Sequence, residues 1–365
     1  MSDFVVIGGG VIGLMTTLQL ADAGYSVSVV ERGHCGREAS WAGGGIVSPL
    51  YPWRYSAPVS RLSTWSEGAY PELALRLLEE TGVDPEYRQK GLLYLRVEDE
   101  DKALMWAREV GKPLSRVGPD MIYTKEPGAC SGIEEALWMP TLGSIRNPRL
   151  MRSLRTRLDA MPGVTFHENC EVRGIVAKGQ GATLETSLGA LSADQVVICS
   201  GAWSAQLLEM LDLRLPVRPV KGQMLLFKAR PGMANRVVLM DGRYVIPRAD
   251  GRVLAGSTLE EAGFDKTTDA AARESLWHSA TSIIPALADC EVEHHWAGLR
   301  PGSPDGVPFI GQVPGMPGIH VNAGHYRNGL VLAPASTRLL VDEMLGRSPI
   351  IDPTPYRLEG RLEQA

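Results

Sequence analysis

The sequence lacks the features that would identify a membrane-spanning, secreted or nucleic-acid-binding protein. Its 365 residues contain no apolar run as long as the ~18 residues of a membrane-spanning helix. The N-terminus leads directly into the strand-like stretch "DFVVIGGG", without the charged, apolar and cleavage regions of a secretory signal. A formal net charge of -5 argues against a nucleic-acid partner, which usually requires a basic face.

Cysteine and histidine are also scarce. Neither residue type occurs at the spacing of metal ligands, and the adjacent His294 and His295 would point to opposite faces of one strand. The sequence therefore predicts no metal site. The cysteines never form a Cys-x-x-Cys pair, which favours reduced thiols and a cytoplasmic location. They are scattered along the chain: Cys35, Cys130, Cys170, Cys199 and Cys290.

The composition is that of a globular protein with room for two domains, since 44% of the residues are hydrophobic and 22% are charged. Its N-terminus carries a dinucleotide-binding pattern. A continuous apolar run over residues 4–7 predicts a strand that is buried on both faces. Gly8, Gly10 and Gly13 then form G-x-G-x-x-G, followed by apolar residues at helical spacing up to a helix end near Gly24.

A second strand, over residues 26–30, ends at Glu31. A carboxylate in this position can accept hydrogen bonds from the ribose hydroxyls of an adenosine. The glycines allow a tight turn and close approach of a pyrophosphate, which the amides of the helix N-terminus stabilise. The sequence therefore predicts dinucleotide binding, but the motif alone does not distinguish NAD from FAD.

The next segment, "EASWAGGGIVSPLY", favours a flavin. Ser40 and the glycines at 43–45 can press backbone against a flat ring, and the apolar exit at Ile46 indicates a packed segment. Helices are predicted over residues 52–80 and 102–110, and a further helix is expected to have Asn147 as its N-cap and Pro148 at its first position.

Strands dominate the rest of the chain. One over residues 195–199 leads into Gly201, which resembles a second approach to the nucleotide, and the strand at 172–175 is expected to lie along the adenine. From Pro216 onward, alternating segments predict an antiparallel sheet with an Asp250-Gly251 hairpin turn. Near the C-terminus, a helix beginning near Gly329 directs its N-terminus at the cofactor.

These motifs carry a resemblance that covers essentially the whole chain. The N-terminal glycines, Glu31, the glycine run after Ser40, "GLRPGSPDGVPFIG" and "GHYRNGLVLAPAS" resemble the D-amino-acid oxidase superfamily of FAD proteins. The last two stretches are most similar to its glycine oxidase branch, which is associated with thiamine thiazole synthesis. The resemblance implies oxidation of glycine to its imine, which hydrolyses to glyoxylate and ammonia while oxygen becomes hydrogen peroxide.

The implied fold is α/β, with a FAD-binding Rossmann-like domain interleaved with an antiparallel-sheet substrate domain. We expect the FAD-binding domain in residues 1–82, 145–215 and 301–365, and the substrate-binding domain in 83–144 and 216–300. FAD is expected to be non-covalent, because "GLRPGSPDG" lacks the cysteine that attaches the flavin in related sarcosine oxidases. The motifs and the resemblance together predict these cofactor-binding residues: Gly8, Gly10, Ile12, Gly13, Glu31, Arg32, Ser40, Gly44, Gly45, Ile46, Val172, Gly201, His325, Tyr326, Asn328, Gly329, Leu330 and Val331.

At the substrate, the resemblance implies that Arg300 clamps the amino-acid carboxylate, with the Tyr244 hydroxyl and Arg327 nearby. A structural ion pair for Arg300 and an ordinary cross-strand role for Tyr244 remain open. No catalytic acid or base is obligatory, because the flavin accepts the hydride. Bulky substrates are expected to collide with Leu259, Met240 and Tyr244.

Several alternatives stay open at this point. The same site would serve a D-amino-acid oxidase, a D-amino-acid dehydrogenase that uses a quinone, or a sarcosine oxidase. A flavoprotein without enzymatic activity is a further alternative. Expected ligands are glycine, sarcosine or small D-amino acids, with oxygen as acceptor, and a homo-oligomer is compatible with the resemblance.

Overall fold

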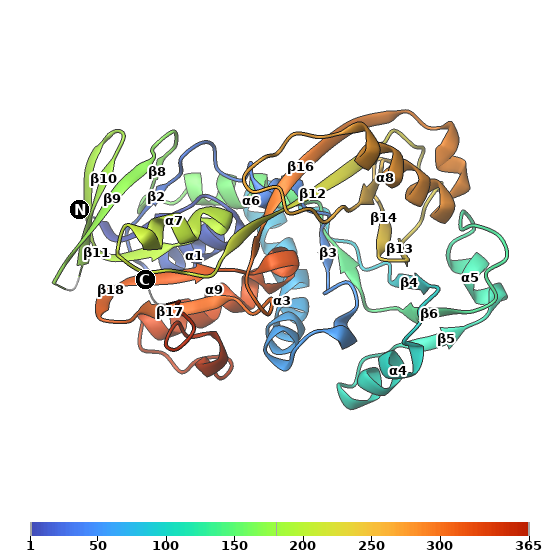
Figure 1. Ribbon diagram of the computed structural model, residues 1–365, viewed down its shortest axis with the longest axis horizontal. Helices are drawn as coiled ribbons and strands as arrows, with labels where there is room; N and C mark the ends of the chain where they lie inside the picture. Colours follow the sequence, from blue (N-terminus) through green and yellow to red (C-terminus); the bar gives the residue numbers. More distant parts are fainter. Residues whose placement is uncertain (1, 180, 364–365) are drawn as a thin grey trace.

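A computed structural model describes residues 2–179 and 181–363, and it divides into two halves (Figure 1). Each half is built around one eight-stranded sheet. The helices are α1 Val11–Asp22, α2 Ala39–Ala42, α3 Ala57–Thr81, α4 Glu100–Glu109, α5 Pro119–Lys125, α6 Asn147–Asp159, α7 Ser204–Glu209, α8 Ala270–Ile283 and α9 Gly329–Met344.

The strands are β1 Ser2–Ile7, β2 Val27–Val30, β3 Ile46–Val47, β4 Leu92–Leu95, β5 Ser115–Val117, β6 Ala136–Met139, β7 Gly143–Ser144, β8 Val164–His167, β9 Val172–Lys178, β10 Gly181–Thr186, β11 Gly189–Ile198, β12 Arg218–Phe227, β13 Val237–Met240, β14 Arg243–Pro247, β15 Val253–Gly256, β16 Val292–Gly302, β17 Phe309–Val313 and β18 Met316–Ala323.

The first sheet has the order β17-β18-β11-β1-β2-β8. Its pairs from β18 to β8 are parallel, whereas β17 is antiparallel to β18, and β9 and β10 extend from β11 as an antiparallel meander. All four residues of β2 are buried, as expected for a parallel strand covered on both faces. The expected Rossmann-like α/β organisation around the glycine motif is therefore confirmed.

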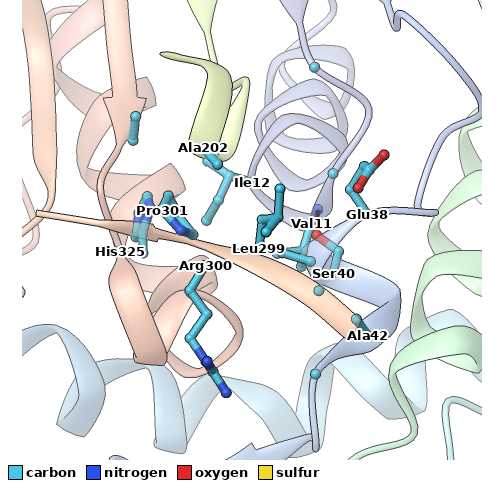
Figure 2. Close-up of a pocket in the computed structure, with 18 of the residues that line it drawn as sticks. Val11, Ile12, Glu38, Ser40, Ala42, Ala202, Leu299, Arg300, Pro301 and His325 are labelled. Carbon is cyan, nitrogen blue, oxygen red and sulfur yellow. Dashed lines mark hydrogen bonds between the residues drawn. The ribbon is translucent and has the colours of Figure 1, made fainter. Parts of the chain in front are cut away.

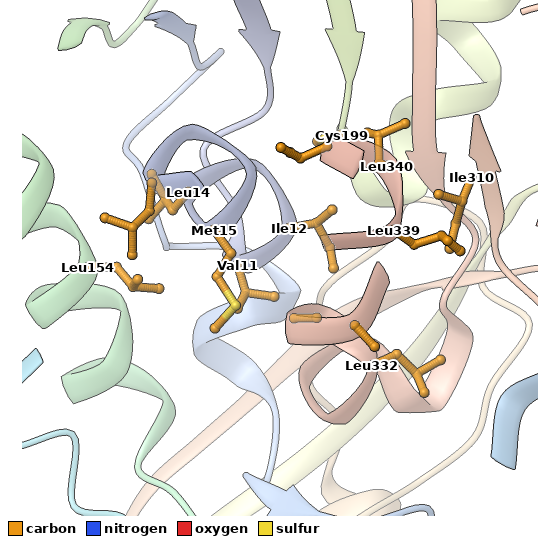
Figure 3. Close-up of a cluster of buried hydrophobic side chains, with 14 of the residues drawn as sticks. Val11, Ile12, Leu14, Met15, Leu154, Cys199, Ile310, Leu332, Leu339 and Leu340 are labelled. Atoms are coloured by element: carbon orange, nitrogen blue, oxygen red, sulfur yellow. The ribbon is translucent and has the colours of Figure 1, made fainter. Parts of the chain in front are cut away.

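Helices α1, α3, α6 and α9 share one hydrophobic core in this half. Val11, Leu14 and Met15 of α1 pack in the same cluster as Leu154 of α6 and Leu339 of α9 (Figure 3). Fully burying one such aliphatic side chain contributes roughly 1.5–3 kcal/mol to folding. This core fixes the N-terminal ends of α1 and α9, two segments that are far apart in the sequence, on the same side of the first sheet.

The second sheet has the order β16-β12-β15-β14-β13-β4-β6-β5. Neighbouring strands are antiparallel except for the parallel pair β13–β4. Its strands come from residues 92–139 and 218–302, so two separate segments of the chain build one sheet. The division at 83–144 and 216–300 remains a prediction, and β16 runs two residues beyond the proposed boundary at 300.

Two predicted details of the helices are wrong. Asn147 is the first residue of α6 rather than its N-cap, and Pro148 is the second residue. The Asn147 amide is buried and donates through Nδ2 to the Ser40 carbonyl at 2.9 Å, so its side chain crosses to α2 and does not cap its own helix. Helix α3 begins only at Ala57, because residues 52–54 form a separate 3-10 turn that begins with a proline.

No helix in the described part of the chain is long and apolar enough to cross a membrane. All five cysteines carry free thiols. Within residues 2–179 and 181–363, no group of three or more His, Cys, Asp or Glu side chains could hold a metal ion.

His320 provides a prediction for the pH dependence of stability. Its ring on β18 is buried, and Nε2 lies 2.6 Å from Gln195 Oε1. Burial lowers the pKa of His320 to about 4, whereas an unfolded chain titrates histidine near ~6.5. Below that higher value the unfolded state binds a proton that the folded state does not, so stability falls as the pH falls towards about 4.

We expect the midpoint temperature of thermal unfolding to decrease as the pH is lowered from about 7 to about 4.5. In His320→Gln, the decrease in this temperature per pH unit should be smaller. Glutamine keeps a polar group opposite Gln195 but does not titrate. The control is His278→Gln, which replaces an exposed ring on α8 and should keep the original slope. Equal slopes in His320→Gln and the unmodified protein would contradict the prediction.

Candidate active site

A long pocket lies between the two halves and runs from the glycine loop after β1 to the end of β16. Figure 2 shows Ile12 of α1, Ser40 of α2 and Leu299 of β16 around it, with the Arg300 side chain extending away from the Ile12 end. The structure brings all but one of the predicted site residues to this pocket: Gly8, Gly10, Ile12, Glu31, Arg32, Ser40, Gly44, Gly45, Ile46, Val172, Gly201, Tyr244, Arg300, His325, Tyr326, Arg327, Asn328, Gly329, Leu330 and Val331.

The exception is Gly13, which acts in packing. A Cβ atom at this position would lie 1.9 Å from the Gly8 carbonyl oxygen, so α1 can pack this closely against the end of β1 only with glycine here. Gly8 itself has a φ of 110°, and a side chain there would meet the Cys199 carbonyl at 2.5 Å. The two glycines hold the N-terminus of α1 at the pocket.

Polar side chains shape this glycine loop. The Gly9 amide donates to Glu31 Oε2 at 2.8 Å, and the Gly33 amide donates to Glu31 Oε1 at 2.9 Å. Each carboxylate oxygen keeps a further acceptor site for a ribose hydroxyl. The Val11 amide donates to Ser40 Oγ at 2.8 Å, which ties α2 to the first turn of α1. The remaining amides at this helix N-terminus favour a bound phosphate.

The wall beyond the helix N-terminus is formed by the glycine run 43–45. A Cβ atom at Gly44 would lie 3.1 Å from the Tyr244 ring and 3.0 Å from Ile246 Cδ1. A Cβ atom at Gly45 would lie 2.0 Å from the Ile145 carbonyl oxygen. The run is therefore packed backbone and not a flexible loop, and its lack of side chains leaves a flat surface beside the pocket.

Helix α9 begins at Gly329 and directs its N-terminal residues into the same pocket. His325, just before it, is 2% exposed, and its Nε2 lies 3.1 Å from Ser336 Oγ. Burial lowers the pKa of His325 to about 3. The ring is therefore neutral at physiological pH and bound to its own helix, which leaves the positive end of α9 as the feature that favours negative charge on a ligand.

Several asparagine atoms at the pocket fit a polar cofactor. Asn322 and Asn328 line the pocket and are almost fully buried, yet both polar atoms of the Asn322 amide and Asn328 Nδ2 find no hydrogen-bond partner among the described residues. Buried polar atoms without partners are costly, so a ligand with matching donors and acceptors is expected here. With the glycine-lined surfaces and Glu31, these atoms fit a dinucleotide that carries a polar ring system.

Arg300 lies at the other end of the pocket and is half-buried. Its Nη1 donates to the carbonyl oxygens of Lys221 and Thr258, each at 3.2 Å, and its Nη2 donates to Ser257 Oγ at 2.8 Å. No carboxylate of the described chain forms an ion pair with it. Burial, together with the nearby Arg327, lowers the pKa of Arg300, but a guanidinium stays protonated at physiological pH.

This observation decides between two interpretations of Arg300. A structural ion pair at the strand end is wrong, because all three hydrogen-bond partners are neutral. A partly buried cation that forms no ion pair is stabilised by an anionic ligand. The geometry therefore fits the clamp that the resemblance implies.

The two other predicted substrate residues differ in burial. Tyr244 is 7% exposed, and its hydroxyl donates to Met224 Sδ at 3.5 Å, a weak acceptor that a carboxylate can replace. Arg327 is exposed at the rim of the pocket. Tyr244 is thus placed to contact a ligand inside the pocket, whereas Arg327 contributes charge at its edge.

Sequence reasoning missed two residues beside Arg300. A Cβ atom at Gly222 would lie 2.1 Å from Arg300 Nη1, so the guanidinium occupies the space of a side chain on β12. Ser257 provides the hydroxyl that accepts from Arg300. Gly222 could have been identified from the sequence, because a glycine inside a strand pattern indicates that another group approaches the backbone closely. The sequence contains no comparable signal for Ser257.

The predicted steric wall was wrong in two of its three members. Leu259 is 55% exposed, and Met240 is buried in the core of the second sheet, so neither lines the pocket. The side chain of Met240 lies on the face of β13 that packs against α8. Besides Tyr244, the pocket wall at this end contains Met224 and Leu50.

Comparisons with known proteins agree with this geometry. Residues 3–343 match the family described as FAD dependent oxidoreductase. The chain is 54% identical to the glycine oxidase of Pseudomonas aeruginosa, covering 98% of this chain and 99% of that protein. It is 31% identical to a bifunctional protein ThiO/ThiG of Synechocystis, covering 96% of this chain and 53% of that protein. The crystal structure of glycine oxidase from Geobacillus kaustophilus superposes with a TM-score of 0.93 at 32% identity, covering 98% of each chain.

Glu31 gives the prediction for cofactor binding. In Glu31→Gln, the amide can accept only one of the two loop N–H groups, and the charge opposite the ribose is lost. Since a hydrogen bond to a charged group contributes about 1.5–3 kcal/mol, the Kd for FAD should rise roughly 10- to 100-fold. The measurement is titration of the apoprotein with FAD, followed by flavin fluorescence.

Glu168→Gln is the matched control. Glu168 Oε1 accepts from the Cys35 amide at 2.7 Å near the same loop, but this residue does not line the pocket. The control should bind FAD nearly as tightly as the unmodified protein. Equal Kd values for the two variants would show that Glu31 is not the ribose partner.

Proposed function

The chain belongs to the FAD dependent oxidoreductase family, and we propose that it catalyses the oxidative deamination of glycine. Glycine loses two electrons and two protons to give its imine, and water converts the imine to glyoxylate and ammonia. Oxygen accepts the two electrons and two protons as hydrogen peroxide. The observation that carries the proposal is the half-buried Arg300 guanidinium, which forms no ion pair with a carboxylate of the described residues at its end of the pocket.

The proposal assigns the nucleotide part of FAD to the glycine loop, with Glu31 and Arg32 at the ribose and Val172 near the adenine. The ring system is assigned to the glycine run with Ile46 and to the N-terminus of α9. Non-covalent attachment is supported by the burial of both thiols that line the pocket, Cys170 and Cys199, and burial raises the pKa of Cys199 to about 12. A protonated, buried thiol is unreactive.

When bound, the flavin supplies the acceptor for the hydride that leaves the substrate Cα. The residues of this chain bind and orient. Arg300 holds the carboxylate with its planar fork, and the Tyr244 hydroxyl donates to the same group. When the carboxylate is fixed at one end of the glycine molecule, the substrate Cα points towards the glycine run. Binding of the carboxylate thereby holds the reacting carbon in the orientation that the reaction requires.

The described residues also restrict proton transfer. The carboxylates that line the pocket, Glu31, Glu38 and Glu171, are not among the groups that act on the charge of Arg300. Glu260 does act on it, but this carboxylate pairs with Lys221 and accepts from Gln223 Nε2 at 3.0 Å. His325 is neutral, and its ring lies against Ser336. We therefore propose that the substrate reacts as the free amine and releases its proton to solvent, so that no acid or base side chain is obligatory.

The physiological role that we propose is supply of glycine imine to thiamine thiazole synthesis, as implied by the resemblance to the glycine oxidase branch. A cytoplasmic location is part of this proposal, since five free thiols suit a reducing compartment. Oxygen as the acceptor also remains a proposal, with a quinone as the alternative.

Arg300 gives the first test. Arg300→Ala should raise the KM for glycine by roughly two to four decades, because removing one member of a buried charge pair costs about 3–5 kcal/mol. Arg300→Lys should recover only part of the activity, since a point charge cannot replace the fork. Arg327→Ala, at the exposed rim, should have a smaller effect. Near-normal turnover by Arg300→Ala with intact flavin would move the clamp to Arg327.

Substrate size gives the second test. We expect kcat/KM to be high for glycine, sarcosine and D-alanine and low for D-phenylalanine, because Tyr244, Met224 and Leu50 close the pocket near Arg300. Each added methylene gains only ~0.8 kcal/mol from burial, so exclusion must come from collision. Peroxide and glyoxylate are measured under air. A preference for D-phenylalanine would indicate a D-amino-acid oxidase. Turnover of sarcosine without turnover of glycine would indicate a sarcosine oxidase. Reduction of a quinone without formation of peroxide would indicate a dehydrogenase.

A further inference from the structure

Arg248 lies outside the pocket but contacts its wall from the other half of the molecule. It follows β14, is 8% exposed, and reaches across to the glycine run. Nη2 donates to the Gly44 carbonyl at 2.8 Å, and Nη1 donates to the Ile145 carbonyl at 3.1 Å. One guanidinium fork therefore joins the second sheet to two backbone segments that belong to the FAD-binding half.

The periodicity of β14 places Arg248 on the same side as two residues that touch Gly44. Alternate residues of a strand share a face, so Tyr244, Ile246 and Arg248 point in the same direction. A Cβ atom at Gly44 would contact Tyr244 and Ile246, and Arg248 binds the carbonyl of the same residue. Tyr244 and Ile246 of β14, and Arg248 just after its end, thus hold Gly44, the first two by packing and the third by hydrogen bonding.

The charge of Arg248 makes these hydrogen bonds strong. No carboxylate of the described residues lies within ion-pair distance of it, and burial lowers the pKa of Arg248 to about 10, so it remains charged at physiological pH. A buried guanidinium whose partners are two carbonyls is expensive to separate from them. The position of Gly44 relative to Tyr244 is therefore tightly restrained.

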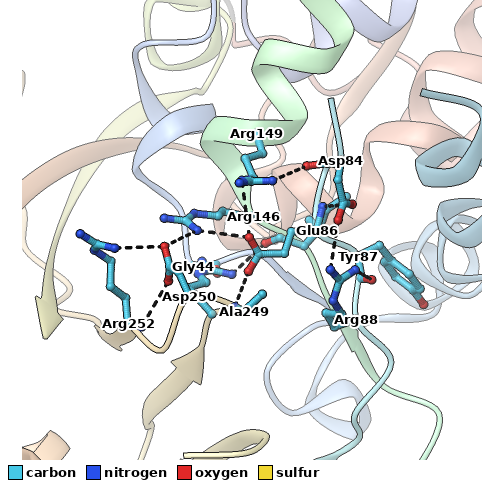
Figure 4. A network of polar contacts seen from close by, with 12 residues as sticks. Gly44, Asp84, Glu86, Tyr87, Arg88, Arg146, Arg149, Ala249, Asp250 and Arg252 are labelled. Atoms are coloured by element: carbon cyan, nitrogen blue, oxygen red, sulfur yellow. Dashed lines mark hydrogen bonds and ion pairs between the residues drawn. The ribbon is translucent and has the colours of Figure 1, made fainter. Parts of the chain in front are cut away.

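A surrounding ionic network holds the hairpin that carries Arg248. Glu86 is 4% exposed, and its Oε1 accepts from the Ala249 amide at 2.7 Å. Arg146 Nη1 donates to Glu86 Oε2 at 3.2 Å and to Asp250 Oδ2 at 2.9 Å (Figure 4). Since Arg146 directly precedes α6, this network fixes the hairpin to the FAD-binding half on the side where Gly44 lies.

We propose that Arg248 is a positioning residue for the substrate site, and this proposal rests on the proposed function. It fixes the Gly44 backbone against Tyr244 and so sets the width of the space between the flavin wall and the carboxylate clamp. It touches neither substrate nor cofactor and acts through Gly44. Without its fork, the glycine run moves relative to Tyr244, and the substrate loses the orientation that Arg300 and Tyr244 impose.

The test compares Arg248→Met with Arg236→Met. Arg236 shares the chemistry of Arg248 but is half-buried: it is an arginine of the second half, burial lowers its pKa, and it donates to two backbone carbonyls, those of Lys125 and Lys90. Unlike Arg248, it contacts no wall of the pocket. Methionine removes the donors in both variants while keeping much of the side-chain volume.

Three readouts are used on the FAD-loaded protein: the visible spectrum of the bound flavin, the Kd for acetate, and glycine kinetics. Acetate carries the carboxylate of glycine but no amine to oxidise. In Arg248→Met we expect a shifted flavin band, a Kd for acetate raised at least tenfold, and a kcat/KM for glycine lowered about 100-fold, the scale of a small misplacement. Arg236→Met should lose thermal stability but keep all three values.

Values for Arg248→Met that match those of Arg236→Met would overturn the proposal and leave Arg248 as a structural tie only. Should Arg248→Met fail to fold, Arg248→Lys carries the test, because its ammonium can reach one of the two carbonyls. A several-fold rise in the acetate Kd would then support the proposal, and an unchanged Kd would overturn it. If the unmodified protein does not oxidise glycine, the proposed function fails, but the flavin spectrum and the acetate Kd still decide the role of Arg248.

Discussion

The site depends on one constraint, which is a half-buried positive charge that forms no ion pair with a carboxylate of the described residues. The Arg300 guanidinium is held by two carbonyl oxygens and one hydroxyl, and it takes the space that a side chain at Gly222 would fill. Such an arrangement is costly until an anion binds. The neutral partners fix the direction of the fork but leave its charge available to an anion, which we propose is the carboxylate of the substrate.

The rest of the molecule positions a second, flat ligand opposite this charge. One sheet and its helices bring the N-termini of α1 and α9 to the pocket, and the other sheet contributes Tyr244 and Arg300 from separate strands. The two halves meet where β14 faces the glycine run. Because glycine has no side chain, the backbone of one half can lie directly against side chains of the other half. The contacts between the two halves therefore determine the distance between the glycine run and the proposed substrate clamp.

The nucleotide half was predictable from sequence because its signals are local. The apolar run of β1, the spaced glycines and Glu31 all lie within the first 31 residues, and each matches the structure.

The substrate half was predictable as an antiparallel sheet, but not in its contacts. Asn147 was assigned to its own helix although it bonds Ser40, and Leu259 and Met240 were assigned to a wall that they do not form. These errors concern side chains whose direction is set by packing between distant segments. Ser257 and Arg248 were missed for the same reason, since nothing near them in the sequence marks what they bind.

We propose that one pocket holds a flavin and, beside it, a carboxylate clamp for glycine. The most direct measurement is anaerobic titration of the purified yellow protein with glycine and, separately, with acetate. Both ligands present a carboxylate to Arg300, but only glycine has an amine and a Cα–H bond that can be oxidised. We expect acetate to perturb the visible flavin spectrum without bleaching it, and glycine to bleach it fully. A flavin that glycine does not bleach, although acetate perturbs its spectrum, would contradict the account.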